Sequence, residues 1–228
     1  MSPVVIRSLL AASLALASTA SLPAQAAVDC KRVKCVALTF DDGPGATTPT
    51  VLKTLRKTGA KATFFLVGKQ VEKRPKIAGQ VLAQGHAIGN HTYAHISLPY
   101  YHDDRILDEL KLGQRVIEKA TGHRPKLFRP PYGHTDDRVL ALAAQTDLAQ
   151  VLWTGTTLDW KLRDPKKIRA AVLRLAKRDG VLLLHDVVPA TAKALPGIVK
   201  ELKKRGYHLV TVPTLLRGKG PVAGESYP

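Results

Sequence analysis

Four short polar clusters, each following an apolar segment, contain the residue types that can carry out hydrolytic chemistry. The first lies at residues 39–44, where the adjacent carboxylates Asp41 and Asp42 come directly after an apolar run. Two neighbouring carboxylates can divide the work, one binding a cation and the other acting as a base. An ordinary Asp-Gly or Gly-Pro turn has the same residues, so this cluster alone leaves both interpretations open.

The second cluster, residues 91–95, places two imidazoles, His91 and His95, four positions apart. On a helix, residues i and i+4 lie on one face, so both side chains could bind one ion. Together with Asp42 they form a set of two His and one carboxylate that leaves coordination positions open for water. This set predicts a catalytic divalent metal site, for which zinc is expected, with cobalt or nickel as alternatives.

The other two clusters contain an arginine and a histidine. At residues 129–133, two prolines stiffen a loop that begins with Arg129 and can hold a guanidinium and a backbone N–H in place, although it also fits a plain turn. The apolar run before His185 is typical of a strand that ends in a structural or catalytic imidazole. Asp159 and Trp160 offer a carboxylate partner and an aromatic wall for a sugar ring.

These clusters need a scaffold, and the hydrophobic pattern predicts one of alternating strands and helices. Strands are predicted at residues 36–40, 62–67, 87–88, 126–128, 149–153, 181–184 and 208–210. Helices are predicted at residues 49–58, 75–84, 103–121, 136–146, 165–178 and 190–205. Such alternation indicates an α/β fold with a parallel sheet, whose strand ends gather polar residues at one edge. About seven units fit either a barrel or an open, doubly wound sheet.

The two ends of the chain differ in composition from this middle part. Arg7, an apolar run over residues 8–20 and an Ala-Gln-Ala end at residue 26 predict a signal peptide, residues 1–26, that is cleaved on export. One domain is expected over residues 27–217, with a flexible Gly/Pro-rich tail at 218–228 and no membrane span. In an exported protein, Cys30 and Cys35 are expected to form a disulfide.

The chain is strongly basic, with a formal net charge of +17 at pH 7. Such an excess attracts polyanions over a long range. Aromatic residues make up 5% of the chain and form no base-stacking motif, so we expect no nucleic-acid partner. Anionic cell-wall polymers are the expected partners, and a merely solvated helix surface is the alternative.

Five motifs taken together resemble the NodB-type polysaccharide deacetylases, carbohydrate esterase family 4. They appear in order as TFDDGP at 39–44, HTYAH at 91–95, RPPYG at 129–133, TTLDW at 156–160 and LLHD at 183–186. Each motif is weak alone, whereas five in order are specific. The resemblance implies a single-domain, distorted (β/α) barrel of about seven strand–helix units, and so favours the barrel.

The resemblance also implies roles for the residues that match the family's motifs. Asp42, His91 and His95 would bind the metal. Asp41 would be the general base, oriented by Arg129. His185 would be the general acid, steered by Asp159.

Further residues would shape the pocket. The backbone N–H of Tyr132 would bind the oxyanion, and Leu183 and Trp160 would contact the acetyl methyl group and the sugar. The fourth motif usually opens with Asp, and Thr156 stands there instead. This departure affects the expected substrate groove rather than the catalytic set, because Asp159 and Trp160 are kept.

The expected function is therefore the metal-dependent removal of N-acetyl groups, with release of acetate, from a GlcNAc-containing polysaccharide such as peptidoglycan or chitin and its oligomers. An O-deacetylase acting on acetylated xylan and a non-catalytic wall-binding member are the alternatives. The protein is expected to be a secreted monomer, associated with the cell wall, whose partner is the acetylated polysaccharide.

Overall fold

The computed structural model describes residues 28–216 and 220–228, so the predicted signal peptide lies outside the described residues. The strands are β1 (Lys34–Asp41), β2 (Thr63–Leu66), β3 (Ala87–Asn90), β4 (Leu127–Phe128), β5 (Ala149–Val151), β6 (Gly155–Thr156), β7 (Gly180–His185), β8 (Tyr207–Leu209) and β9 (Ser226–Tyr227). The α-helices are α1 (Thr48–Thr58), α2 (Gly68–Lys73), α3 (Pro75–Ala83), α4 (Asp103–Thr121), α5 (Asp137–Gln145), α6 (Asp159–Leu162), α7 (Pro165–Leu175), α8 (Pro189–Lys204) and α9 (Val212–Leu215).

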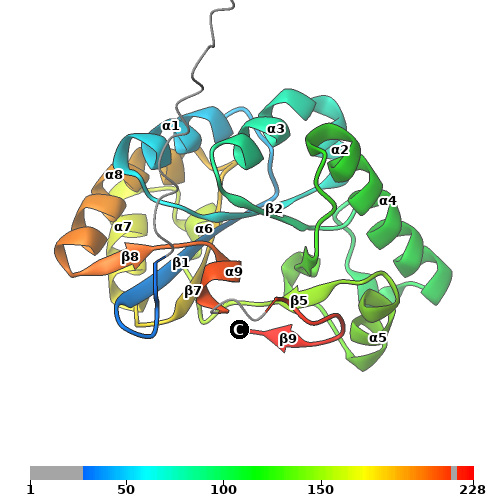
Figure 1. Ribbon diagram of the computed structural model, residues 1–228. Helices are drawn as coiled ribbons and strands as arrows, with labels where there is room; N and C mark the ends of the chain where they lie inside the picture. The colour runs from blue at the N-terminus through cyan, green and yellow to red at the C-terminus, as the bar shows by residue number, and fades with distance from the viewer. Residues whose placement is uncertain (1–27, 217–219) are drawn as a thin grey trace, which may run out of the picture.

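The strands form one parallel sheet in the order β6-β7-β1-β2-β3-β4-β5-β9, and β8 pairs with the first residues of β1. The sheet curls into a half-barrel with most of its helices on the outside (Figure 1). Within the described residues, the end strands β6 and β9 do not pair with each other. The expected single-domain, distorted α/β barrel is therefore confirmed.

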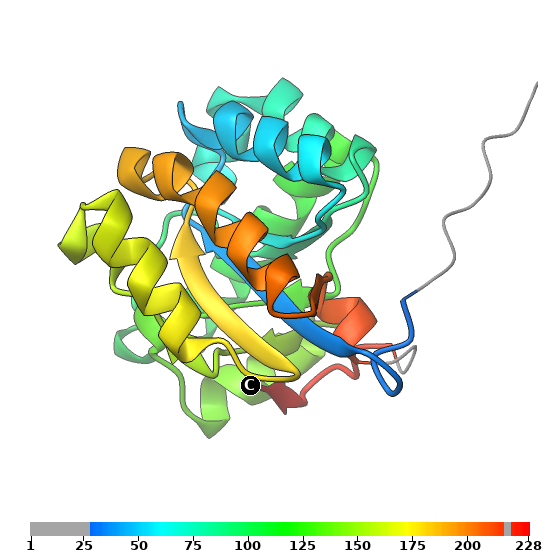
Figure 2. The ribbon, with the colours of Figure 1, turned by 90° about the vertical axis from the view of Figure 1, so that its left-hand side faces the viewer.

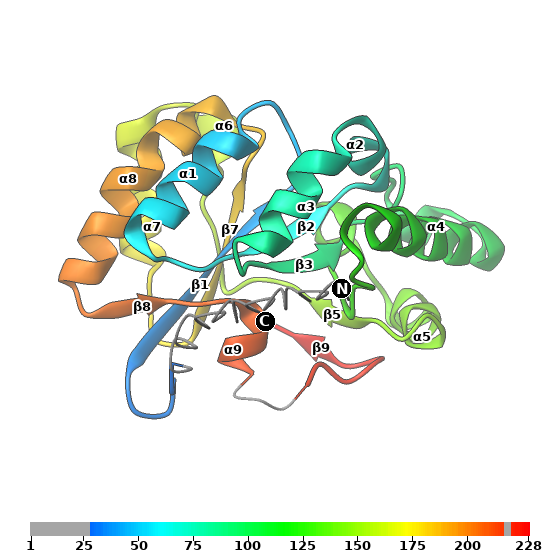
Figure 3. The same cartoon turned by 45° about the horizontal axis from the view of Figure 1, so that its top comes forward.

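The helices cover two flanks of the sheet. Helices α1, α8 and α7 lie side by side on one flank, and α2, α3 and α4 lie on the other (Figure 3). Figure 2 shows the first flank face on, with α7, α8 and α1 running alongside the long strands β7 and β1.

Strand β1 lies in the middle of the sheet because it is apolar on both faces. Every residue after Lys34 is buried, and Phe40 stacks on Phe64 of β2 with 5.1 Å between ring centroids. Helix α4 instead buries one stripe, including Ile106 and Leu110, and exposes its charged side. This difference follows from the sequence, since helices on a sheet are half-buried whereas central parallel strands are buried on both faces.

Of the tail expected to be flexible, residues 218–228, the structure describes residues 220–228. Its last residues form β9, which pairs with β5 in parallel, and the Gln150 N–H donates to the Glu225 carbonyl over 2.8 Å. Tyr227 also packs against an apolar cluster that includes Val151. The sequence does not predict β9, because a strand of two residues is too short to show an alternating hydrophobic pattern.

At the other end of the domain, Cys30 and Cys35 are joined by a disulfide, as predicted. Both are buried and pack against Val210, so the disulfide fixes the entry to β1. No helix within the described ranges is long and apolar enough to cross a membrane.

Candidate active site

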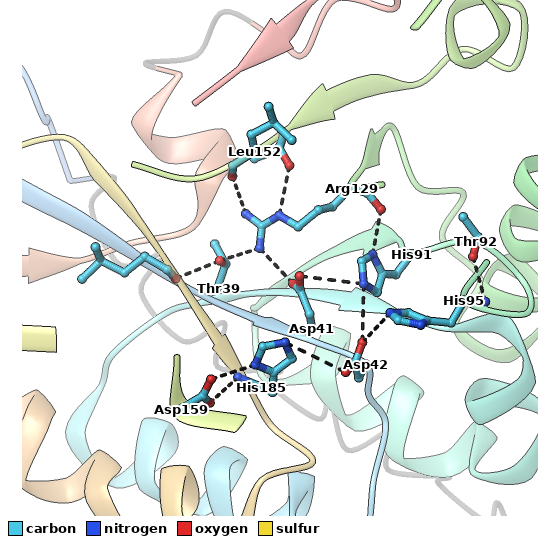
Figure 4. A network of polar contacts seen from close by, with 12 residues as sticks. Thr39, Asp41, Asp42, His91, Thr92, His95, Arg129, Leu152, Asp159 and His185 are labelled. Carbon is cyan, nitrogen blue, oxygen red and sulfur yellow. Dashed lines mark hydrogen bonds and ion pairs between the residues drawn. The ribbon is translucent and has the colours of Figure 1, made fainter. Parts of the chain in front are cut away.

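The parallel register of the central strands brings the polar clusters to one edge of the sheet. Asp41, the last residue of β1, pairs in register with His185, the last residue of β7. Asp42 follows Asp41 in a left-handed conformation with φ 71°, which turns the chain at the strand end. Figure 4 shows both carboxylates beside the imidazoles of His91 and His95, from the loop after β3, and of His185, at the end of β7.

Arg129 is fully buried beneath this edge and fixes Asp41. Its Nη1 donates to Asp41 Oδ1 over 2.8 Å, and its other N–H groups donate to the carbonyls of Val151 and Leu152. The guanidinium also lies 4.1 Å from the ring centroid of Phe65. The second oxygen of Asp41, Oδ2, makes no contact with Arg129 and lies 3.8 Å from His91 Nε2, so it can accept a proton.

The side chains of Asp42, His91 and His95 converge as a candidate metal site. Asp42 Oδ1 lies 3.5 Å from His91 Nε2 and 3.1 Å from His95 Nε2, and one ligand atom from each residue lies within 4.8 Å of the others. His91 Nδ1 is 2.7 Å from the carbonyl of Arg129. This contact requires the proton on Nδ1 and leaves the lone pair of Nε2 free to bind an ion, as second-shell partners of metal-bound His do.

Two further observations fit a cation at this position. Asp42 Oδ1 is buried and makes no hydrogen bond within the described structure, so a strong acceptor is left for another partner. Burial by itself would raise the pKa of Asp42, but its contacts with His91 and His95 lower the pKa well below its usual range. Asp42 is therefore an anion at neutral pH, as a metal ligand must be.

The segment at residues 91–95 is not the helix that the spacing suggested. Thr92 and His95 both have positive φ, 62° and 57°, so the segment is a tight loop. The loop is closed by two hydrogen bonds, from the His95 N–H to Thr92 Oγ1 and from the Ala94 N–H to the buried carboxylate of Glu109 on α4. The two imidazoles converge through loop geometry rather than helix periodicity.

His185 and Asp159 form a separate pair on the opposite side of the two aspartates. His185 Nδ1 lies 2.8 Å from Asp159 Oδ1, and the His185 N–H donates to Asp159 Oδ2 over 2.8 Å. Thr191 Oγ1 donates to the same Oδ2. Burial alone would lower the pKa of His185, but the hydrogen bond and charge of Asp159, with smaller contributions from Asp41 and Asp42, raise it to about 9.

The side chains border a pocket of about 480 Å³ at the strand ends. Its wall consists of aromatic and apolar residues beside the charged groups: Tyr132, Trp153, Thr156, Leu158, Trp160 and Leu183. Tyr132 and Trp160 are 61% and 52% exposed, so they stand at the mouth, where a sugar ring can stack. The predicted strand at 149–153 includes Trp153, which in the structure follows β5 and lines the pocket. Leu158 was not predicted to line the pocket; its position shortly after β6 is the signal that could have indicated this.

The loops around this pocket contain an unusual concentration of left-handed backbone. Asp42, Thr92, His95, Tyr132 and Leu158 all have φ between 52° and 71°. For residues other than glycine this conformation costs roughly 1–3 kcal/mol each, and it is commonly retained where a loop must aim a group at a ligand. The strain is concentrated at the carboxyl ends of the strands, where the candidate catalytic residues lie.

Asp186, the last residue of the fifth motif, is a buried residue for which sequence reasoning gave no role. Its Oδ2 accepts a hydrogen bond from Thr48 Oγ1, and burial raises its pKa to about 7. A Cβ atom at Gly43 would lie 2.4 Å from the same oxygen, so only glycine fits between this side chain and the loop that carries Asp42. Asp186 thus packs beneath that loop rather than facing the pocket.

Comparisons with known proteins agree with this geometry. A family model described as polysaccharide deacetylase matches residues 29–151. A peptidoglycan-N-acetylglucosamine deacetylase of Bacillus cereus is 41% identical over 196 residues, which cover 82% of this chain and 90% of that protein. The peptidoglycan-N-acetylmuramic acid deacetylase PdaC of Bacillus subtilis is 39% identical over 86% of this chain, which spans only 41% of that longer protein. A solved structure described as T48 deacetylase with substrate has a TM-score of 0.85 and 40% identity, covering 89% of this chain and 100% of that one.

Proposed function

Because this chain belongs to the polysaccharide deacetylase family, we propose that it is a metal-dependent hydrolase that removes N-acetyl groups from peptidoglycan. The observation that carries the proposal is the arrangement within one pocket of an oriented base, a candidate metal site and an acid of raised pKa. An unactivated amide can be hydrolysed by these three together, whereas a purely binding module needs neither a base nor an acid.

Asp42, His91 and His95 would hold the cation, for which we propose zinc, with cobalt or nickel as alternatives. Bound there, a divalent cation would polarise the acetyl carbonyl and lower the pKa of a nearby water. The protein's part is to fix the three ligands, and the contact between His91 Nδ1 and the Arg129 carbonyl orients that ring.

Asp41 is proposed as the general base. Arg129 occupies its Oδ1 and leaves Oδ2 to accept the proton of the attacking water. As the water oxygen bonds to the carbonyl carbon, negative charge moves onto the carbonyl oxygen. We propose that the backbone N–H of Tyr132, on the rigid loop after β4, helps to stabilise this oxyanion, since donors fixed before the reaction need no reorganisation.

His185 is proposed as the general acid. Its raised pKa keeps it protonated at neutral pH, so Nε2–H can donate to the amide nitrogen as the C–N bond breaks. The products are the free amine on the sugar and acetate. We propose that Leu183 and Trp160, which line the pocket, contact the acetyl methyl group and the sugar ring respectively.

The substrate can be tested directly by measuring acetate release from peptidoglycan, chitin oligomers and acetylated xylan, side by side with the metal-reconstituted protein. We expect the highest turnover on peptidoglycan. A clear preference for acetylated xylan would show that the protein is an O-deacetylase acting on an ester. If a protein shown to contain metal released no acetate from any of the three, the proposal of enzymatic activity would be contradicted.

We also propose that the protein is exported and acts in the cell wall, with residues 1–26 removed. The basis is the basic and apolar start of the chain together with its Ala-Gln-Ala end. Mass spectrometry of protein recovered from the culture medium should give an N-terminus at Ala27 and no free thiol. An intact Met1 in all fractions would contradict export by this route.

A further inference from the structure

The positive charge of this chain is not spread evenly over its surface. Helices α1, α7 and α8, which lie side by side on one flank, contain a single acidic residue, Glu201. Their exposed basic residues, together called the basic flank, are Lys53, Arg56, Lys57, Lys166, Lys167, Arg169, Arg174, Lys193, Lys200, Lys203 and Lys204. The fold thus gathers cations from helices that are far apart in the sequence.

Helix α4 on the opposite flank provides an internal comparison. Its exposed side mixes Lys111, Arg115 and Lys119 with acidic residues, and Arg105 pairs with Glu109. A solvated helix surface therefore does not require charges of one sign in this protein. Arg56, Lys57, Arg174, Lys203 and Lys204 stand in last helical turns, where cations stabilise the helix. The cations at the other positions of the basic flank have no such explanation.

The basic flank also lacks the features that stack the bases of a single-stranded nucleic acid or insert into a membrane. The three helices contain no aromatic residue, so there is no surface on which bases can stack. The large exposed apolar residues of the described chain all lie outside these helices, so no apolar side chain is available to enter a lipid interface. What remains is a surface of spaced cations, which complements a hydrophilic chain of spaced anions.

The flank reaches the rim of the catalytic pocket. Helix α6, which carries Trp160, packs against α7, and Arg163 at its end borders a hollow of about 530 Å³ together with Lys193 of the basic flank. The remaining cations extend from there along α7, α8 and α1. A polymer lying along the flank would therefore pass beside the pocket without filling it.

We propose that the basic flank is a docking surface for an acidic polysaccharide, which holds the enzyme beside its substrate by electrostatic attraction. The proposal concerns binding alone and goes beyond the proposed deacetylation. Binding of such a chain releases counterions and is screened over about 8 Å at physiological ionic strength, so it should weaken steeply as salt is added.

The test uses two matched triple variants of the whole protein. The flank variant is Lys166→Gln, Arg174→Gln and Lys200→Gln; the control variant is Lys111→Gln, Arg115→Gln and Lys119→Gln on α4. Both remove two Lys and one Arg from exposed positions that make no ion pair in the described structure. Thermal unfolding midpoints establish that both variants remain folded, independently of any activity.

The probe is polygalacturonate, with neutral dextran as the blank, titrated from about 50 to about 500 mM salt. Since each exposed charge pair contributes roughly twofold to fivefold, the flank variant should bind at least about tenfold more weakly, with a shallower salt dependence, and the control variant within about twofold of the parent. Equal weakening of both variants would overturn the proposal, because net charge would then be responsible. Tighter binding to single-stranded DNA or to phosphatidylglycerol vesicles than to polygalacturonate would overturn the choice of partner.

Discussion

The pocket contains two carboxylate–imidazole groups that are built from the same residue types but are suited to opposite tasks. On one side, Asp42 meets two imidazoles, keeps an unsatisfied oxygen and has a pKa well below its usual range. On the other, His185 contacts Asp159, whose oxygens are all engaged, and its Nε2 lies 4.0 Å from Asp42 Oδ2. The pKa of His185 is raised to about 9. The first group offers lone pairs to a cation, and the second holds a proton.

The difference between the two groups arises from where their hydrogen bonds go. The Nδ1 proton of His91 is directed at a backbone carbonyl, so its Nε2 is the nitrogen that faces Asp42. The Nδ1 proton of His185 is directed at a buried carboxylate, which stabilises the imidazolium. In this pocket, the imidazole at the candidate metal site has a neutral carbonyl as its Nδ1 partner, and the imidazole of raised pKa has a carboxylate.

The largest effect is expected at the metal side. Asp42→Ala removes the one anionic ligand, so we expect loss of bound metal and of acetate release to the background level, because a site of two His binds weakly. Metal content measured by inductively coupled plasma mass spectrometry is the direct readout. A chelator should likewise inactivate the parent protein, and activity should return when zinc or cobalt is added. Full activity in a sample verified to be free of metal would contradict the proposal of metal dependence.

A smaller loss is expected when the proton-transfer groups are replaced and the metal is kept. Asp41→Asn and His185→Ala should each lower kcat by about 10²- to 10⁴-fold while leaving one metal per chain, because each removes a general base or acid without removing a ligand. Turnover is compared with metal content in the same preparation. If Asp41→Asn lost its metal in proportion to its activity, the division of labour between Asp41 and Asp42 would be wrong.

The acid side can be probed through pH. Because the raised pKa of His185 depends largely on Asp159, activity that needs the imidazolium should persist to about pH 9 and fall above it. In Asp159→Asn the pKa falls towards the ordinary His value of about 6.5, so the alkaline limb of kcat should move to lower pH. An unmoved limb in this variant, with kcat simply reduced at all pH values, would mean that Asp159 only orients the ring.

The smallest effect is expected at Tyr132, which belongs to neither group. Its proposed contribution is the backbone N–H, so Tyr132→Phe should retain the conformation of the loop and change kcat by less than about threefold. Its ring lies edge-on to His95, with 4.8 Å between centroids, and phenylalanine keeps that contact. A loss of about a hundredfold would instead assign a role to the phenolic hydroxyl, comparable to that of a general acid.

Much of this site could be predicted from the sequence, because the motif residues lie directly after apolar runs and parallel strands bring their ends together. Asp41 and His185 meet by strand register, which is a consequence of that pattern. The backbone conformation of the loops that carry the site residues could not be predicted. Residues 91–95 have the spacing of a helix yet form a loop, in which the Ala94 N–H donates to the buried carboxylate of Glu109 on the following helix, α4.

The missed elements have a common physical reason. Strands β6 and β9 are two residues long, and their position depends on a neighbouring strand edge rather than on a periodic pattern of their own. Asp186 was missed because burial of a carboxylate is a property of the surroundings, here Thr48 and the close approach of Gly43, which the local sequence does not reveal.

The buried ion pair between Arg129 and Asp41 matters both for the proposed catalysis and for the stability of the fold. A variant in which Asp41 becomes an apolar residue leaves a fully buried guanidinium without its counter-ion, which costs about 3–5 kcal/mol out of a total stability of about 5–15 kcal/mol. In the course of divergence, an inactive descendant of this chain should therefore tend to lose Arg129 as well, since the second replacement restores much of the stability that the first removes. Asp41 and Arg129 would therefore be conserved together or lost together.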